Sequence, residues 1–201
     1  MSLEVRRMLE EDVDLVVDLY YEAFWDKAVA LKNLDKDLAL ELIKVVLFKH
    51  PLNYQNYHIG LVDGQALGFI KLMTHESQEK MAMPSWSLIK SIGLFKLVKT
   101  GLLLSLIEER VKKGDLYIET LATHPKARGQ GLGTHLLQFA DQVVLGDGTL
   151  NRVSLAVIGR NSRAKALYYR QGFVVDKALE SRILNRFLNI NKVYHMKKDK
   201  V

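Results

Sequence analysis

The chain has 201 residues, of which 48% are hydrophobic and 26% charged, with a formal net charge of +6. This is an ordinary globular composition, and the length predicts one domain whose core needs no disulfide or metal to stabilise it. Because the chain has no cysteine, disulfides, thiolate metal sites and a cysteine nucleophile are excluded.

The positive charge is modest, at 29 Lys and Arg against 23 Asp and Glu. It fits either solubility or an anionic partner such as a nucleotide or an acidic substrate, and no block of like charges predicts a nucleic-acid tail. No signal peptide is visible at the N-terminus, so we expect a cytoplasmic protein. Lys90, Lys96 and Lys99 interrupt the apolar stretch 88–107, so we expect no stable membrane insertion there.

The first part of the chain is predicted to fold as one strand followed by two helices. Apolar residues alternate in Leu3–Met8, which predicts a strand, and recur at helical spacing in Glu10–Lys27 and Asp35–Lys49. Pro51 ends the second helix, because proline cannot continue it.

A β-hairpin is predicted next. Two alternating segments, Tyr57–Val62 and Ala66–Met73, flank Asp63-Gly64-Gln65, and Asp-Gly between such segments is a hairpin signal. The stretch from about 75 to 115 that follows is far longer than usual connections. Its apolar residues surround the helical wheel, so we expect inserted helices that pack on the core, cover the substrate as a lid, or form a dimer interface. We favour the lid.

The last part alternates strands and helices. The predicted elements are a strand Leu116–Thr123, a helix Gly133–Val144, a strand Arg152–Ile158, a helix Asn161–Gln171, and closing strands Phe173–Asp176 and Lys192–Lys197. Consecutive strands early and alternating ones later predict a mixed sheet of about six to seven strands in an α/β (α+β) fold, with the helical insertion between its third and fourth strands. Residues 1–201 are thus one expected domain.

A glycine-rich loop between a predicted strand and a predicted helix indicates a phosphate site. Glycine lets backbone N–H groups approach a ligand, and a helix N-terminus favours an anion. The loop is neither a dinucleotide fingerprint, which needs Gly where Thr134 stands, nor a Walker loop, which needs Gly-Lys-Ser/Thr. Its residues are Arg128, Gly129, Gln130, Gly131, Leu132, Gly133 and Thr134.

With a second pattern downstream, the chain resembles the GCN5-related N-acetyltransferase (GNAT) superfamily. The loop matches that family's Arg/Gln-x-x-Gly-x-Gly/Ala, and residues 161–173 match Asn-x-x-Ala-x-x-x-Tyr-x-x-x-Gly-Phe. The matched positions are Arg128, Gly131, Gly133, Asn161, Ala164, Tyr168, Gly172 and Phe173. The resemblance covers residues 116–173 most firmly, and implies a splayed sheet and direct acetyl transfer from acetyl-CoA to an amine, without an acyl-enzyme.

The resemblance also implies where the cofactor lies. Backbone groups of Leu121, Ala122 and Thr123 would bind the pantetheine arm, and an N–H there would polarise the thioester carbonyl. Thr123 departs from the apolar residue that the family usually has before His-Pro, which backbone contacts should tolerate. The glycine loop would hold the pyrophosphate, with Asn161 and Ala164 completing the cofactor site.

Tyr168 is the expected acid that protonates the leaving thiolate, and Glu119 the expected base, with Asp26, Glu22 and His124 as weaker candidates. An ordinary packed tyrosine and a salt-bridged glutamate are the structural alternatives. No metal is expected, because the six histidines show no ligand spacing.

The acceptor is expected to be an amine-bearing small molecule or peptide, held near Phe24, Trp25, Asp26 and the stretch Arg182–Asn191, and a homodimer is possible. Two other functions stay open: a non-catalytic CoA-binding regulatory domain and a membrane-peripheral acyltransferase.

Overall fold

A computed structural model describes residues 1–24, 35–48, 51–77, 90, 93 and 110–200 of the chain. The strands are β1 (Leu3–Arg7), β2 (Tyr57–Val62), β3 (Gln65–Met73), β4 (Asp115–Thr123), β5 (Arg152–Ile158), β6 (Val174–Glu180) and β7 (Lys192–Asp199). The helices are α1 (Val13–Phe24), α2 (Lys36–Phe48), α5 (Leu132–Gly146), α6 (Ser162–Arg170) and α7 (Arg182–Leu188). Short 3₁₀ turns cover Glu10–Asp12, Pro51–Asn56 and Pro125–Ala127.

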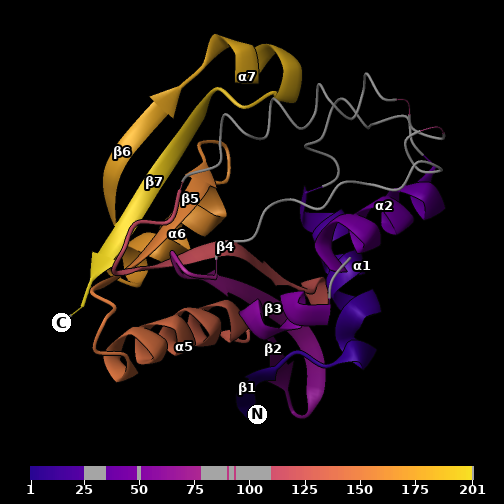
Figure 1. Cartoon of the computed structure of the whole chain (residues 1–201), viewed down its shortest axis with the longest axis horizontal. Coiled ribbons are helices and arrows are strands. Elements are labelled where there is room, and N and C mark those ends of the chain that lie inside the picture. The colour runs from indigo at the N-terminus through magenta and orange to yellow at the C-terminus, as the bar shows by residue number, and fades with distance from the viewer. Residues whose placement is uncertain (25–34, 49–50, 78–89, 91–92, 94–109, 201) are drawn as a thin grey trace.

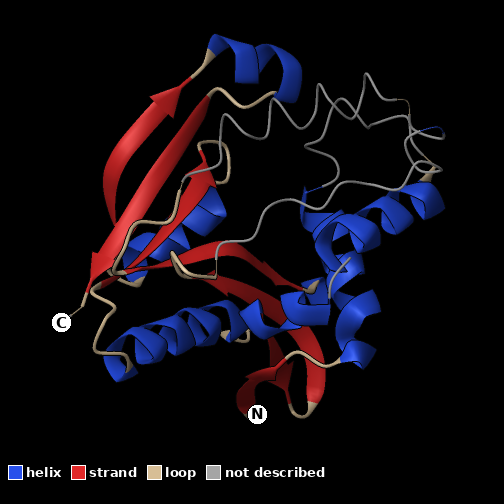
Figure 2. Ribbon diagram, viewed as in Figure 1, coloured by secondary structure: helices blue, strands red, loops and turns tan. Residues whose placement is uncertain are grey.

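The described strands form one seven-stranded sheet with the order β1-β2-β3-β4-β5-β7-β6. Neighbouring strands are antiparallel except β4 and β5, which are parallel. Helices cover both faces, with α5 running beneath β3 and β4 and with α1 and α2 on the other side (Figures 1 and 2). The mixed, helix-flanked α+β sheet predicted from the sequence is therefore confirmed.

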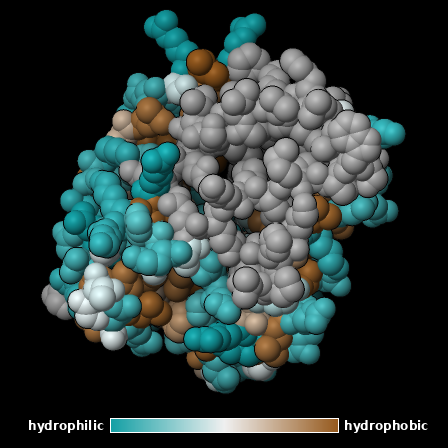
Figure 3. Space-filling model, in the orientation of Figure 1, coloured by the Kyte–Doolittle hydropathy of each residue, from teal (hydrophilic) through white to brown (hydrophobic). Residues whose placement is uncertain are grey.

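Two hydrophobic cores hold these layers together. On one face, α5 buries the stripe Leu136, Ala140 and Val144 against β3, β4 and β5, with α6 beside it. On the other face, α1 buries Val16 and Val17 with α2 against β2 and β3. Burying one large apolar side chain contributes about 1.5–3 kcal/mol, so the apolar periodicity that predicted these helices also docks them. Hydrophilic side chains cover much of the described surface around β6 and β7 (Figure 3).

The predicted hairpin is present, and its turn explains its sequence. Asp63 and Gly64 have φ values of 47° and 79°, and two positive φ values at the centre of a two-residue loop are what an Asp-Gly type I′ turn provides. The other predicted elements differ from the observed ones mainly at their ends. β6, for example, continues to Glu180, past the predicted end at Asp176.

A helix is present where sequence reasoning predicted only a part of the acceptor pocket. In α7 the Ser181 hydroxyl accepts a hydrogen bond from the Leu184 amide at 3.2 Å, and Asn189 ends the helix in a left-handed conformation. Leu184 and Ile190 are buried against Val193, so this short helix packs on the same sheet face as α1. Most of the predicted insertion at 75–115, and therefore its lid or interface role, lies outside the described residues.

Two glycines bring the start of α5 close to the sheet. Gly60 and Gly68 are paired across β2 and β3, and a Cβ on either would come within 2.9–3.0 Å of the Leu132 side chain. Leu132 is 1% exposed, so it fills the space that the missing side chains leave. None of the described helices is both long and apolar enough to span a membrane.

Candidate active site

The centre of the site is the point where β4 and β5 separate. Their pairing runs from Asp115 with Arg152 to Ile118 with Leu155 and ends there. Beyond it, Glu119–Thr123 pairs only with β3. Because buried backbone N–H and C=O groups need partners, the β5-facing edge of this half-strand can receive a ligand that carries amides of its own.

An irregularity in the β3–β4 pairing sets the position of Glu119. Lys71 pairs with Thr120 and Leu72 with Ile118, so Glu119 is the extra residue of a bulge. Bulges re-aim a side chain and end regular pairing. Here the bulge coincides with the point where β4 leaves β5.

The predicted phosphate loop joins the end of β4 to α5. Gly129 and Gly131 both have positive φ, 78° and 79°, which glycine adopts without strain. Gly131 is the N-cap of α5 and supplies no side-chain hydrogen bond, so the first amides of a 15-residue helix are left to other acceptors. Arg128 is exposed beside them. This end of α5 is thus suited to an anion.

Tyr168 lies on α6 on the α5 side of the sheet. Its side chain is buried, at 8% exposure, and its ring centroid is 5.8 Å from that of Phe173. Burial raises the pKa of the Tyr168 phenol to about 12, so this hydroxyl stays protonated throughout the neutral range. The neighbouring Tyr169 is 50% exposed and points elsewhere.

Glu119 belongs to a cluster on the opposite face of the sheet. Its carboxylate is 2.9 Å from the Lys71 ammonium, and the two side chains are 33% and 8% exposed. The ammonium also lies 5.2 Å from the centre of the Tyr57 ring. Burial, and secondly the negative charge of Glu119, raises the pKa of Tyr20 on α1. Glu119 therefore forms the salt bridge that was expected from the sequence as the alternative to a role as the base.

A family model for the acetyltransferase (GNAT) family matches residues 21–173. The chain belongs to the GNAT family. The resemblance seen in its motifs is thereby confirmed, and its reaction class is acetyl transfer. A search of curated proteins found no match.

Solved structures share the fold of this acetyltransferase. An N-acetyltransferase from Staphylococcus aureus Mu50 matches with a TM-score of 0.68 and 23% identity, over 97% of this chain and 100% of that one. PaiA N-acetyltransferase from Thermoplasma acidophilum, solved in complex with coenzyme A, matches with a TM-score of 0.60 and 17% identity over 99% of both chains. Arabidopsis thaliana NAA60, in complex with a bisubstrate analogue, matches with a TM-score of 0.59 and 17% identity over 98% of both chains.

Three residues that the sequence predicted for the site of this GNAT protein have structural contacts. The Asn161 side chain accepts a hydrogen bond from the Ala164 amide at 3.1 Å and so caps α6, the helix that carries Tyr168. Ala164 packs against the core. His124 accepts a hydrogen bond from the Lys126 amide at 3.1 Å, a loop-stabilising role that gives no support to its use as a base.

The remaining candidates for the base and the acceptor site are an exposed residue, Glu22, and residues that the structure describes only in part or not at all. Glu22 is exposed on α1, whereas Trp25 and Asp26 lie outside the described residues and Phe24 is described only by its backbone. Sequence reasoning missed Lys71. Its signal was a lysine in the middle of the apolar run Leu67–Met73, which a buried strand accepts only when the charge has a partner.

Proposed function

We propose that this protein is an acetyl-CoA-dependent N-acetyltransferase that transfers the acetyl group directly to an amine-bearing small molecule or peptide. The observation that carries the proposal is the half-paired strand β4, with the uncapped start of α5 following its C-terminus and the Glu119–Lys71 pair on the face away from α5. A cofactor and an acceptor can then approach the same backbone from opposite faces of the sheet.

The chain's own backbone would bind the cofactor. The free edge of Leu121, Ala122 and Thr123 would exchange hydrogen bonds with the amides of the pantetheine arm, as a neighbouring strand does. An N–H of this edge would also stabilise the oxyanion that develops on the thioester carbonyl. The amides of Gly131–Thr134 would bind the pyrophosphate, and Arg128 adds a charged, forked donor.

Tyr168 would assist the leaving group. The amine nitrogen attacks the carbonyl carbon, the carbon–sulfur bond breaks, and the sulfur leaves with the electron pair. A phenol with a pKa of about 12 is a weaker acid than a thiol, whose pKa is near 8.5. Tyr168 would therefore act mainly as a hydrogen-bond donor to the developing thiolate, and any proton that it gives to the departing sulfur would be replaced from water.

Glu119 would accept the proton that the ammonium group of the acceptor loses, directly or through one water molecule. Its ion pair with Lys71, at 2.9 Å, fixes the side chain at the bulge. The proton acceptor would then lie on the acceptor face, opposite the face of Tyr168.

The test combines binding with turnover. We expect CoA and acetyl-CoA to raise the midpoint temperature of thermal unfolding. At a free ligand concentration about 100 times the dissociation constant, the free energy of unfolding should rise by about 2.7 kcal/mol. An amine panel should then give acceptor-dependent thiol release. If calorimetry shows no heat and no bound CoA, the proposed function is wrong.

Glu119→Gln tests the base. We expect it to lower kcat by roughly 10²-fold near pH 7 and to have less effect at high pH, where more of the amine is already deprotonated. Glu41→Gln, an exposed carboxylate on α2, is the matched control and should keep full activity. Equal activities of the two variants at pH 7 would remove Glu119 from the mechanism.

A further inference from the structure

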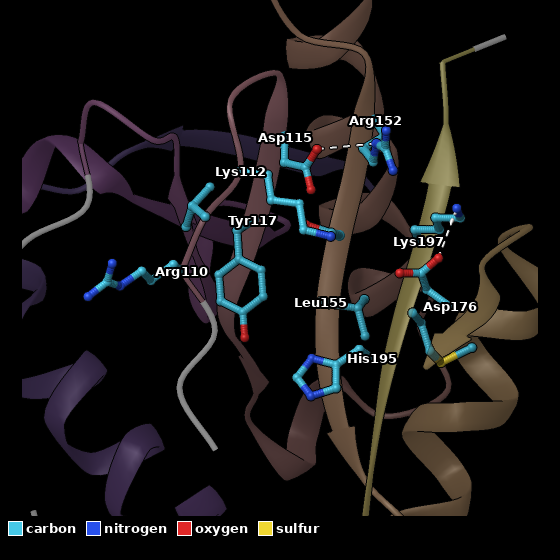
Figure 4. A pocket seen from close by; sticks show the side chains of 12 residues that line it. Arg110, Lys112, Asp115, Tyr117, Arg152, Leu155, Asp176, His195 and Lys197 are labelled. Atoms are coloured by element: carbon cyan, nitrogen blue, oxygen red, sulfur yellow. Dashed lines mark ion pairs between the residues drawn. The ribbon is translucent and has the colours of Figure 1, made fainter. Parts of the chain in front are cut away.

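A hollow lies on the acceptor face of the sheet, next to the point where β4 and β5 separate. Its polar lining comes from β4, β5, β6 and β7 and from the segment just before β4 (Figure 4). Tyr117 pairs with Ser154, and Ser154 pairs with Lys197, so the floor is one row across three strands. His195 lies one step further along β7 and faces Tyr117 in the close view (Figure 4).

The hollow and Glu119 are on the same face. Ile118, between Tyr117 and Glu119, is buried in the core under α5, and alternate residues of a strand point to the same side. Two residues along a strand span about 6.6 Å. A group bound at Tyr117 and an amine at Glu119 would therefore be close enough for a short linker of a few bonds to join them.

The charges around the hollow leave an excess of cations. Both lining acids are paired: Asp115 lies 3.2 Å from the Arg152 guanidinium, and Asp176 lies 2.9 Å from the Lys197 ammonium. Arg110 and Lys112 also line the hollow, and neither forms an ion pair with a carboxylate of the described residues. Lys197, and more weakly Lys112, lower the pKa of Asp176. Four cations face two acids, so the hollow keeps an excess of two positive charges beside an aromatic ring and an imidazole.

We infer that this hollow binds an anionic group of the acceptor, so that the substrate is an amine with a carboxylate or a phosphate several bonds from its nitrogen. The inference rests on the proposed N-acetyltransferase function and specifies its substrate class. Lys112 and Arg110 attract and hold the anion. The side chains of Tyr117 and His195 line the floor against which the linker packs, which directs the amine toward Glu119.

A matched pair of acceptors tests the substrate class. 6-Aminohexanoate and 6-aminohexanamide differ only in the charge of the distal group, and 5-aminopentyl phosphate supplies the phosphate alternative. Because hydrogen bonds between charged groups are stronger than those to a neutral amide, we expect kcat/KM to be about tenfold or more higher for the acids than for the amide. Equal values for all three would overturn the inference while leaving the proposed function intact.

A pair of adjacent lysines provides the variant and its control. Lys112→Glu should raise KM for the acidic acceptors about tenfold or more, and leave KM for acetyl-CoA unchanged. Lys113→Glu makes the same charge change at an equally exposed neighbour that does not line the hollow, and should change KM less than about twofold. Equal effects of the two variants would reduce the result to a long-range charge effect and overturn the inference.

A binding measurement separates this site from the catalytic proposal. If no amine is acetylated, inorganic phosphate is titrated into the protein while the imidazole signal of His195, assigned with His195→Gln, is followed by NMR. A saturable shift in the wild type that Lys112→Glu removes supports the anion site, even where acetyl transfer fails. A signal that phosphate does not shift overturns it.

Discussion

The two halves of β4 are both strand but have different neighbours. The first, Asp115–Ile118, pairs with β3 and β5, and the second, Glu119–Thr123, pairs with β3 alone. In the first half Leu116 and Ile118 are buried in the core, and Asp115 pairs with Arg152. The difference shows how one strand can serve stability over half its length and present an open edge, inside the sheet, over the rest.

The largest expected effect is a loss of CoA affinity when the proposed pyrophosphate site, at the start of α5, is blocked. Gly131→Glu places a side chain at φ 79° and a negative charge beside the first amides of α5, so CoA affinity should fall by more than about 100-fold. Titration calorimetry measures it. Gly148→Glu, at a loop position with open space around it, is the control and should bind CoA normally. Normal binding by both variants would exclude this helix end as the pyrophosphate site.

A smaller effect should follow from removing the phenol beside the open half. Tyr168→Phe should lower kcat by roughly 10²-fold, in the range of acid–base groups, with little change in acetyl-CoA affinity. Steady-state kinetics and calorimetry together check this, and Tyr169→Phe, exposed on the same helix, is the control. Full turnover by Tyr168→Phe on a true acceptor would show that Tyr168 is only a packed residue.

The same tyrosine predicts a pH effect on stability. Its pKa of about 12 exceeds the ordinary value of 10.0, so the unfolded chain releases the proton first. The free energy of unfolding should therefore fall as the pH rises from about 10 to 12. In Tyr168→Phe this part of the alkaline loss should be absent from denaturation curves, whereas a loss as large as that of the wild type would contradict it.

The smallest effect should appear in the fully paired part of the sheet. Burial, and secondly Arg7, lowers the pKa of His58 on β2 from 6.5 to about 4. The unfolded chain binds the proton first as the pH falls, so between pH 6.5 and 4 the fold should lose about 1–2 kcal/mol, allowing for partial exposure.

His58→Phe should reduce that acid-side slope with little change in CoA affinity, because His58 packs on Phe139, with ring centroids 4.7 Å apart, and β3 lies between β2 and the open edge of β4. Urea denaturation at several pH values measures the slope. His75→Gln, at an exposed position, is the control and should leave it unchanged. Identical slopes in both variants would assign the acid loss to other groups.

Much of the fold is readable from local pattern, because local physics determines it. The Asp63-Gly64 turn, the α5 stripe and the Asn161 cap each depend on residues within a few positions of one another. The part that could not be read depends on register. Which residue of β4 is the bulged one, and that Lys71 meets Glu119, follow from pairing between strands more than forty positions apart in sequence.

The candidate site shows the same division. The phosphate loop and the Tyr168 motif were predicted from their spacing and from the family resemblance. The hollow at Tyr117 was not, because its lining comes from four strands and a connecting segment, and no spacing in the sequence brings Lys112 and His195 together. α7 was missed since a seven-residue helix carries too few turns for its periodicity to be distinct.

The pair Gly60 and Gly68 has a consequence for any attempt to engineer this enzyme. A methyl group at either position would press on Leu132, the first residue of α5, and at Gly68 also on the Ala122 carbonyl oxygen at 3.0 Å. At Gly60 the tips of the Leu132 and Leu136 side chains would have to give way, and at Gly68 backbone is met as well, so we expect the start of α5 and its leading amides to shift. Cofactor affinity is then adjustable from the middle of a β-hairpin, at two positions that a mutant library restricted to ligand-contacting residues would leave out.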